Sequence, residues 1–256
     1  PFLSFLFICI GGLNSSVILT SLDYKNYTEK LLSYLEPVLL SLKRSRFVRC
    51  WHAKTDGWAA STFHSNCDGR GPTLTIIKAV NSIFGGYTDV SWSSPCGYSS
   101  ASKAFVFSLY NAKGYNPVKL TQYRYQQNAM YRCSSYGPTF GGHDIYVSND
   151  AGNNQNSSTS CGSTYSKPPG YSNGYCGFFT GARYFTPSDI EVLFEIAWFS
   201  DSKSACAEPY TAAKYYSGYC GNCDKRIISQ FPTISAYQLN QGKKCIFFAV
   251  AIELNQ

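Results

Sequence analysis

Charged side chains are scarce in this sequence. Asp, Glu, Lys and Arg make up 14% of its 256 residues, whereas about 25% is usual in a globular protein. The 22 basic residues outnumber the 15 acidic ones and give a net charge of +7, but they are scattered and form no long basic run. Nucleic-acid-binding proteins concentrate their cations in a patch or stripe. The sequence therefore predicts no nucleic-acid partner and a weak attraction for acidic surfaces.

The sequence also lacks an apolar run of the length that crosses a membrane, which is about 20 residues. Its first charged residue is Asp23, but the apolar start is short and is followed by Gly11, Gly12 and a Ser pair. This order is typical of a secretory signal peptide, with a membrane anchor as the alternative. We expect residues 1–20 to be a signal-peptide remnant, cleaved between Gly12 and Thr20, of a secreted, extracellular protein without stable membrane insertion.

Cysteine, by contrast, is abundant. One of the 11 cysteines, Cys9, lies in the predicted signal, so an even number would remain after cleavage. In a secreted chain this predicts a disulfide framework whose connectivity the spacing does not determine. The candidates are Cys50, Cys67, Cys96, Cys133, Cys161, Cys176, Cys206, Cys220, Cys223 and Cys245. Acceptor triplets make Asn26 and Asn156 candidates for N-glycosylation, and Asn156 has the more loop-like setting.

Apolar spacing predicts helices near the N-terminus. An amphipathic helix is expected over 21–44, bent or restarted at Pro37. Its apolar positions are Leu31, Leu35, Val38, Leu39 and Leu42. After a strand over 46–53, a short helix is expected over 55–67, capped by Thr55 or Asp56, with Phe63 and Cys67 facing inward.

Short strands separated by Gly, Pro, Asn and Ser follow. They are expected at Thr73–Lys78, Ile83–Thr88, Ala104–Tyr110, Pro117–Gln122, Ala129–Arg132, Asp144–Ser148, Asp189–Ala197 and Cys245–Glu253. Parallel sheets need crossover helices, which are missing, so the pattern predicts a mainly β protein with short helices: an antiparallel two-sheet β-sandwich stabilised by disulfides. We expect one domain over 45–199 and a cysteine-containing extension over 200–256 that ends in a strand.

Two features inside this pattern concern packing and chemistry. Gly85 and Gly86 interrupt a strand, which predicts a bulge, a positive φ or close approach by another group, with Trp58 and Trp92 as candidates to fill the space. His64, Cys67 and Asp68 lie close together in "FHSNCDGR". A nucleophilic Cys67 with His64 as base is one interpretation, but a disulfide or a buried thiol is favoured because no third member is recognisable.

The remaining chemical candidates have structural interpretations too. Asp68-Gly69 and the "GGHD" segment with His143 are typical of turns, in which both histidines would be held by hydrogen bonds. Cys220 and Cys223 form a Cys-x2-Cys pair without a second half, so disulfides are favoured over zinc or a redox pair. We expect no metal and no cofactor.

Five segments, in order, resemble the motifs of a TLDc domain, the domain of the oxidation-resistance protein family. They are "DGWAASTFHSNCDGRGPTLTIIK", "SIFGGYTDVSW", "SSASKAFVFSLYN", "GPTFGGHDIYVSND" and "GARYFTPSDIEVLFEI". The resemblance covers about Ser45 to Ile196. It implies a sandwich of two antiparallel sheets with short helices at its side, and it brings no accepted catalytic residue.

The resemblance implies protection from oxidative stress, which cytosolic members provide, and some members bind the proton-pumping vacuolar ATPase. Cys67 matches a cysteine of the family motif, whereas the other cysteines suit an oxidising compartment, where that pump's cytosolic face is out of reach. We therefore expect a secreted module that binds an unknown protein or extracellular-matrix partner, or protects against oxidants, without turnover. The rival is a redox or hydrolytic enzyme that uses Cys67 with His64, or Cys220 with Cys223.

Overall fold

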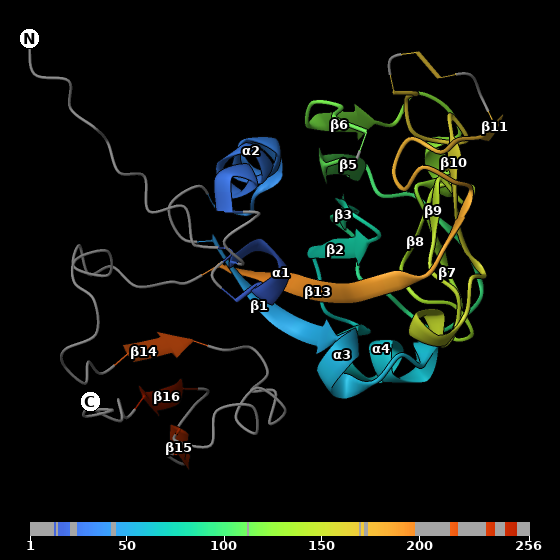
Figure 1. Ribbon diagram of the computed structural model, residues 1–256. Coiled ribbons are helices and arrows are strands. Elements are labelled where there is room, and N and C mark those ends of the chain that lie inside the picture. The colour runs from blue at the N-terminus through green and yellow to red at the C-terminus, as the bar shows by residue number, and fades with distance from the viewer. Residues whose placement is uncertain are drawn as a thin grey trace, which may run out of the picture. The chain divides into compact units, whose positions relative to one another are not determined.

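A computed structural model of the chain is shown in Figure 1. It describes residues 13, 15–20, 25–41, 45–111, 113–168, 170–171 and 174–197, and the backbone of three strands farther along the chain. The chain divides into two compact units, Pro1–Ala197 and Trp198–Gln256.

The first unit is a sandwich of two antiparallel sheets. Sheet 1 has the order β1 (Ser45–His52), β13 (Pro187–Ala197), β2 (Thr73–Ala79), β3 (Ser82–Thr88), β5 (Phe105–Tyr110), β6 (Val118–Thr121). Sheet 2 has the order β11 (Gly174–Tyr175), β10 (Ser157–Cys161), β9 (Ile145–Tyr146), β8 (Thr139–Phe140), β7 (Met130–Arg132), β4 (Gly97–Ser99), and β12 (Tyr184–Phe185) also pairs with β10. This confirms the predicted mainly β sandwich.

The main core lies between the two sheets. Side chains at alternate positions of a strand face the same side, and Phe84, Phe140 and Ile145 are among those buried here. The short strands of sheet 2 were harder to predict. β4, β8, β10, β11 and β12 carry mostly Gly, Ser, Thr and Tyr, so they show no long apolar alternation.

A second core covers the opposite face of sheet 1. It is built by α1 (Val17–Thr20), α2 (Lys25–Leu35) and the 3-10 helix η1 (Glu36–Val38), which Figure 1 shows on the side of sheet 1 away from sheet 2. Ile18, Leu31 and Leu35 are buried against sheet 1. We call residues 13–41 the N-terminal cover. The α-helix ends at Leu35 and continues as η1, which contains Pro37, where the bend or restart was predicted, and Leu39 is extended; residues 21–24 and 42–44 lie outside the described part.

The helix predicted over 55–67 is two helices, α3 (Ala53–Asp56) and α4 (Ala60–Cys67). Gly57 separates them with φ +103°, a conformation that favours glycine. The predicted cap by Thr55 or Asp56 is wrong, because the backbone N–H of Ala60 donates to the side chain of Asn149. Phe63 and Cys67 are buried as expected.

The two glycines of β3 admit close neighbours, as predicted, but the neighbours are not tryptophans. A Cβ on Gly85 would lie 1.9 Å from the carbonyl oxygen of Thr75, and one on Gly86 would lie 2.7 Å from the ring of Phe140. Trp92 packs edge-on against Phe140, with centroids 5.6 Å apart, and Trp58 lies over Gly152 instead. The missing Cβ of Gly86 therefore lets the two sheets approach at this point, whereas that of Gly85 leaves room for its neighbour within sheet 1.

The second unit contains a small antiparallel sheet. Its order is β14 (Tyr216–Tyr219), β16 (Lys244–Ala249), β15 (Ile234–Gln238). The strand predicted at Cys245–Glu253 overlaps β16. Cys206, Cys220 and Cys223 lie outside the described residues, and Cys245 is described by its backbone alone.

Candidate functional site

The cysteine nearest to a predicted base is not a free thiol. Cys67, at the end of α4, forms a disulfide with Cys50 of β1, and both residues are buried. The bond links the helix to the edge strand of sheet 1. Since a nucleophilic cysteine must be a thiolate, Cys67 has no such role in this form of the protein.

His64 is engaged through both ring nitrogens. Its Nδ1 lies 2.7 Å from Oδ1 of Asp68, and its Nε2 lies 2.8 Å from the carbonyl oxygen of Cys133 and 3.1 Å from that of Tyr136. A general base needs a nitrogen that can accept a proton from the substrate or nucleophile. His64 instead holds the turn over 133–136 against α4.

The "GGHD" segment is a turn, and its two polar residues have different partners. His143 has φ +66°, and its ring stacks on that of Tyr146 with centroids 5.0 Å apart. Aromatic packing, rather than the expected hydrogen bonding, fixes this ring, and burial lowers the pKa of His143. The carboxylate of Asp144 accepts the backbone N–H groups of Ser163 and Thr164, at 2.9 and 2.8 Å.

Asp144 is a buried acid beside a glycine. A Cβ on Gly141 would lie 2.0 Å from its Oδ2, so the carboxylate occupies space that only glycine leaves open. Burial raises the pKa of Asp144 to about 6, although the N–H groups of Ser163 and Thr164 and the charge of Arg124 act in the opposite direction.

The four candidates His64, Cys67, Asp68 and His143 thus have structural partners and do not converge as a nucleophile with its base.

Two more disulfides lie in the described part of the chain. Cys96 pairs with Cys133, and Cys161 with Cys176. Asn156, the loop-like glycosylation candidate, is exposed just before β10. The side chain of Asn26 lies outside the described residues.

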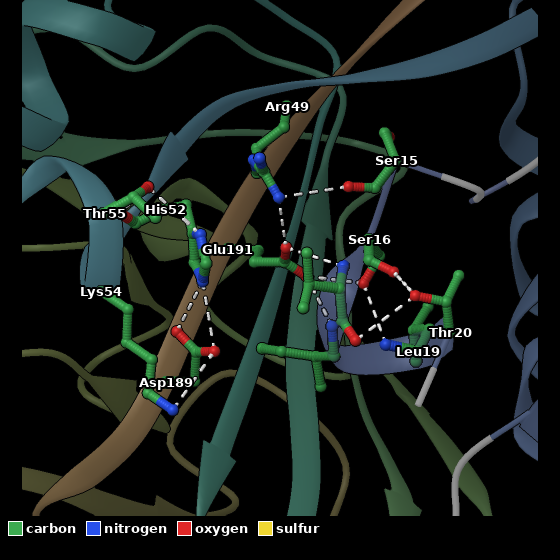
Figure 2. Close-up of polar contacts among 12 residues, drawn as sticks. Ser15, Ser16, Leu19, Thr20, Arg49, His52, Lys54, Thr55, Asp189 and Glu191 are labelled. Carbon is green, nitrogen blue, oxygen red and sulfur yellow. Dashed lines mark hydrogen bonds and ion pairs between the residues drawn. The ribbon is translucent and has the colours of Figure 1, made fainter. Parts of the chain in front are cut away.

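Sequence reasoning missed a row of buried carboxylates on β13. Figure 2 shows Glu191 and Asp189 among their partners. Glu191 is fully buried; it accepts the hydroxyl of Ser16 at 2.6 Å, the backbone N–H of Val17 at 2.9 Å and Nη1 of Arg49 at 3.0 Å. The acids at 189, 191 and 195 in "SDIEVLFEI" were the available signal, because alternate strand positions share a face.

His52 joins Asp189 in an arrangement that resembles part of a catalytic triad. His52 Nε2 lies 3.0 Å from Asp189 Oδ1, and its Nδ1 lies 3.2 Å from the hydroxyl of Thr55 (Figure 2). The Thr55 hydroxyl has a shorter contact, however, of 2.9 Å to Oδ1 of Asp56. A hydroxyl that donates to a carboxylate is not prepared to transfer its proton to the imidazole.

The sequence that forms this sandwich matches a known protein family. A profile of the TLDc domain matches residues 14–194, which is more than half of the chain. The chain belongs to the TLDc domain family. No curated protein shows a significant match to the chain. The match to the TLDc domain begins inside the N-terminal cover, well before the Ser45 start that the motifs predicted.

Hydrogen bonds from polar side chains hold the N-terminal cover of this TLDc domain against sheet 1. Lys119 Nζ donates to the carbonyl oxygen of Tyr34 at 2.7 Å, and the Tyr87 hydroxyl donates to that of Val38 at 3.2 Å. Glu195 accepts the N–H of Leu40 at 2.7 Å and the hydroxyl of Ser45. Burial lowers the pKa of Lys119 and raises that of Glu195. These bonds make the cover part of the TLDc domain.

A cavity of about 310 Å³ lies beside these contacts in the TLDc domain. Its lining includes Val38, Lys103, Phe105, Lys119 and Gln122, and none of the candidate catalytic residues. Among the described residues, no three His, Cys, Asp or Glu side chains gather as metal ligands. In the same part of the chain, no helix combines the length and apolar content of a membrane span.

Proposed function

We propose that the chain is a secreted, disulfide-stabilised TLDc domain that binds a protein or extracellular-matrix partner, or protects against oxidants, without turning over a substrate. The disulfide between Cys50 and Cys67 carries this proposal, because it occupies the cysteine for which His64 was the candidate base. Three buried or part-buried disulfides also suit an oxidising compartment.

The rival enzyme would need a free thiol or an activated hydroxyl. Both ring nitrogens of His64 have other hydrogen-bond partners, so neither can accept a proton from Cys67. The Thr55 hydroxyl lies closer to the carboxylate of Asp56 than to the ring of His52. The Cys220 and Cys223 pair of the rival lies outside the described residues. The proposal therefore favours binding over catalysis.

Thiol mapping tests the proposal directly. The full chain would be secreted from cultured animal cells, alkylated under denaturing conditions without reductant and digested for mass spectrometry, with a reduced sample as control. We expect Cys50, Cys67, Cys96, Cys133, Cys161 and Cys176 to be oxidised. Five or more free thiols in the secreted protein would contradict both the compartment and the structural role of the cysteines.

Active-site probes separate the two hypotheses. Neither iodoacetamide nor a fluorophosphonate is expected to label the native secreted protein. Labelling of Cys67, Cys220 or Cys223 by the first, or of Thr55 by the second, would favour the enzyme. The variants Cys67→Ala and Thr55→Val are the matched controls for the assignment of a labelled residue.

A further inference from the structure

The outer face of sheet 2 bears a connected group of aromatic rings. Tyr98 of β4 lies across from Tyr131 of β7, with ring centroids 4.9 Å apart. Tyr131 contacts Tyr136 at 5.6 Å, and Tyr136 contacts Tyr146 of β9 at 4.9 Å. With the ring of His143 stacked on Tyr146, these five side chains form what we call the tyrosine face: Tyr98, Tyr131, Tyr136, His143 and Tyr146.

Strand alternation directs the face away from the core. Met130, Phe140 and Ile145 are neighbours in β7, β8 and β9 and point into the sandwich, so Tyr131 and Tyr146 point outward. Tyr98 is 48% exposed, and the other four residues are partly exposed. Among the described elements in Figure 1, the helices lie beyond sheet 1 or at one end of the sandwich, and none covers this side of sheet 2.

The tyrosine face is fixed before any ligand binds. The disulfide between Cys96 and Cys133 lies two residues from Tyr98 in β4 and from Tyr131 in β7. His64 bonds to the carbonyl oxygens of Cys133 and Tyr136, which bracket the turn between them. Rigid aromatic side chains lose little conformational entropy on binding. His64, a candidate catalytic base, thus holds the turn that carries Tyr136 of this face.

The chemistry of the face restricts what can occupy it. Tyrosine hydroxyls are neutral near pH 7, and burial lowers the pKa of His143, so the ring is neutral as well. The carboxylate of the neighbouring Asp144 is buried and turned toward Ser163 and Thr164. The exposed large aliphatic residues, Val17, Leu40 and Val80, all lie on other elements. The face therefore combines apolar ring surfaces with hydroxyls and has no formal charge.

Exposed hydroxyls border the aromatic rings at the turn. Ser158 of β10, which pairs with Tyr146, is only 9% exposed and offers a ligand little surface. The turn beside Tyr136 adds Ser134 and Ser135, both exposed. Tyrosine is enriched at protein-binding surfaces too, but serine is depleted there, and here two exposed serines border the rings. Uncharged, hydroxyl-rich surface matches an uncharged, hydroxyl-rich ligand.

We propose that the tyrosine face binds a neutral glycan. The C–H face of a sugar ring would lie on the aromatic rings, whose surface is apolar, while its hydroxyls exchange hydrogen bonds with the tyrosine hydroxyls and the ring nitrogens of His143. This inference rests on the proposed binding function and specifies its ligand: the sugar chain of an extracellular matrix or cell-surface glycoconjugate.

A glycan microarray holding neutral and acidic glycans tests the proposal, followed by calorimetric titration of the strongest neutral glycan. We expect binding to neutral glycans, weakened about tenfold by Tyr131→Ala or Tyr146→Ala, which corresponds to about 1.4 kcal/mol, near the upper end of the range for an aromatic contact. Tyr146→Phe keeps the ring and should stay within a few-fold of the parent. Tyr115→Ala is the matched control, because Tyr115 contacts Tyr171 and Phe178 instead.

Several outcomes would overturn the inference. These are no binding to any neutral glycan, binding to acidic glycans alone, or equal weakening by Tyr115→Ala. Self-association that Tyr98→Ala abolishes, measured by sedimentation, would assign the face to a second copy of the chain. If no neutral glycan binds while a captured protein partner binds both the parent and the Tyr131→Ala variant, the glycan inference fails and the proposed binding function stands. Melting curves establish that each variant is folded.

Discussion

At the scale of single residues, Gly86 is required because the ring of Phe140 occupies the place of its Cβ. Gly86→Val should lower the free energy of unfolding by about 1 to 3 kcal/mol through overpacking. Urea denaturation measures this loss. Secretion should fall in parallel, before any specific binding changes.

A double variant tests whether the ring is the obstacle. Gly86→Ala combined with Phe140→Leu should cost less than the sum of the two single changes, since the shorter side chain vacates the contact. Gly85→Ala should be worse than Gly86→Ala, because its new atom meets the backbone carbonyl of Thr75, which cannot rotate away. Equal costs at the two glycines would contradict this explanation.

Asp144 makes stability depend on pH in the direction opposite to most carboxylates. Its pKa is raised to about 6 in the folded chain and is about 4 when unfolded. Between these values the folded state binds more protons, so the contribution of Asp144 to stability falls as pH rises from about 4 to about 6, by about 3 kcal/mol in total.

The comparison of unfolding free energies at several pH values checks this sign. The parent should lose stability relative to Asp144→Asn as pH rises through the window, whereas the exposed Asp150→Asn control should track the parent. NMR titration should place the Asp144 carboxyl near pH 6. A titration near pH 4 would show that the backbone hydrogen bonds and the charge of Arg124 fully offset the effect of burial.

Glu191 of β13 holds the N-terminal cover in place, because its carboxylate accepts hydrogen bonds from the start of α1. Glu191→Gln places an amide among donors and leaves Arg49 without its buried partner. The expected loss is about 3 to 5 kcal/mol by chemical denaturation. Glu36→Gln, at an exposed position of η1, should change stability by less than about 0.5 kcal/mol. A small loss at Glu191 would mean that the cover is not held by this carboxylate.

At the scale of elements, the N-terminal cover limits where a signal peptide could end. The Ser15 hydroxyl donates to the carbonyl oxygen of Phe47, and the Ser16 hydroxyl donates to the buried carboxylate of Glu191. A cut after these residues would remove both hydrogen bonds. Within the predicted range of Gly12 to Thr20, we expect cleavage at the upstream limit, between Gly12 and Leu13. N-terminal sequencing of the secreted protein measures this site, and a mature start at Val17 or later would contradict the prediction.

The elements that sequence predicted well are those with long apolar patterns. β2, β3, β5 and β13 have four or more buried residues in succession, and a run of this kind indicates a strand whatever its neighbours. β8 and β12 have two residues each, and their pairing depends on partners distant in sequence. The contacts that hold the cover were equally hidden, because the carboxylates that accept its hydrogen bonds, on β13, lie far along the chain.

The candidate site could be predicted only in part. A buried Cys67 followed from its position on an apolar helix face, but its partner Cys50 depends on where β1 crosses α4. The tyrosine face has no local signature at all. Tyr98, Tyr131 and Tyr146 come from three strands, and only the order of sheet 2 brings their rings together.

At the scale of the whole molecule, none of the three described disulfides joins one sheet of the sandwich to the other. Cys50–Cys67 joins sheet 1 to α4, whereas the other two close loops within the region of sheet 2. Replacing Cys50 and Cys67 together by Ala should cost about 2 to 4 kcal/mol, as for loops of this size. Thermal unfolding of the secreted variant, compared with the parent, tests this value; an unchanged melting temperature would show that packing alone holds α4.

The pairing of β1 with β13 determines how the domain would respond to tension. Ser45 lies opposite Ala197, so the chain enters the first strand and leaves the second at the same end of the pair. A pull between the two ends would open this pair by peeling, one hydrogen-bonded position after another, which takes less force than shearing all positions at once. Cys50, farther along β1, is bonded to Cys67, so the residues between these two cysteines would carry no load and would not extend. A tethered copy would therefore lengthen less on unfolding than the same copy with this disulfide reduced.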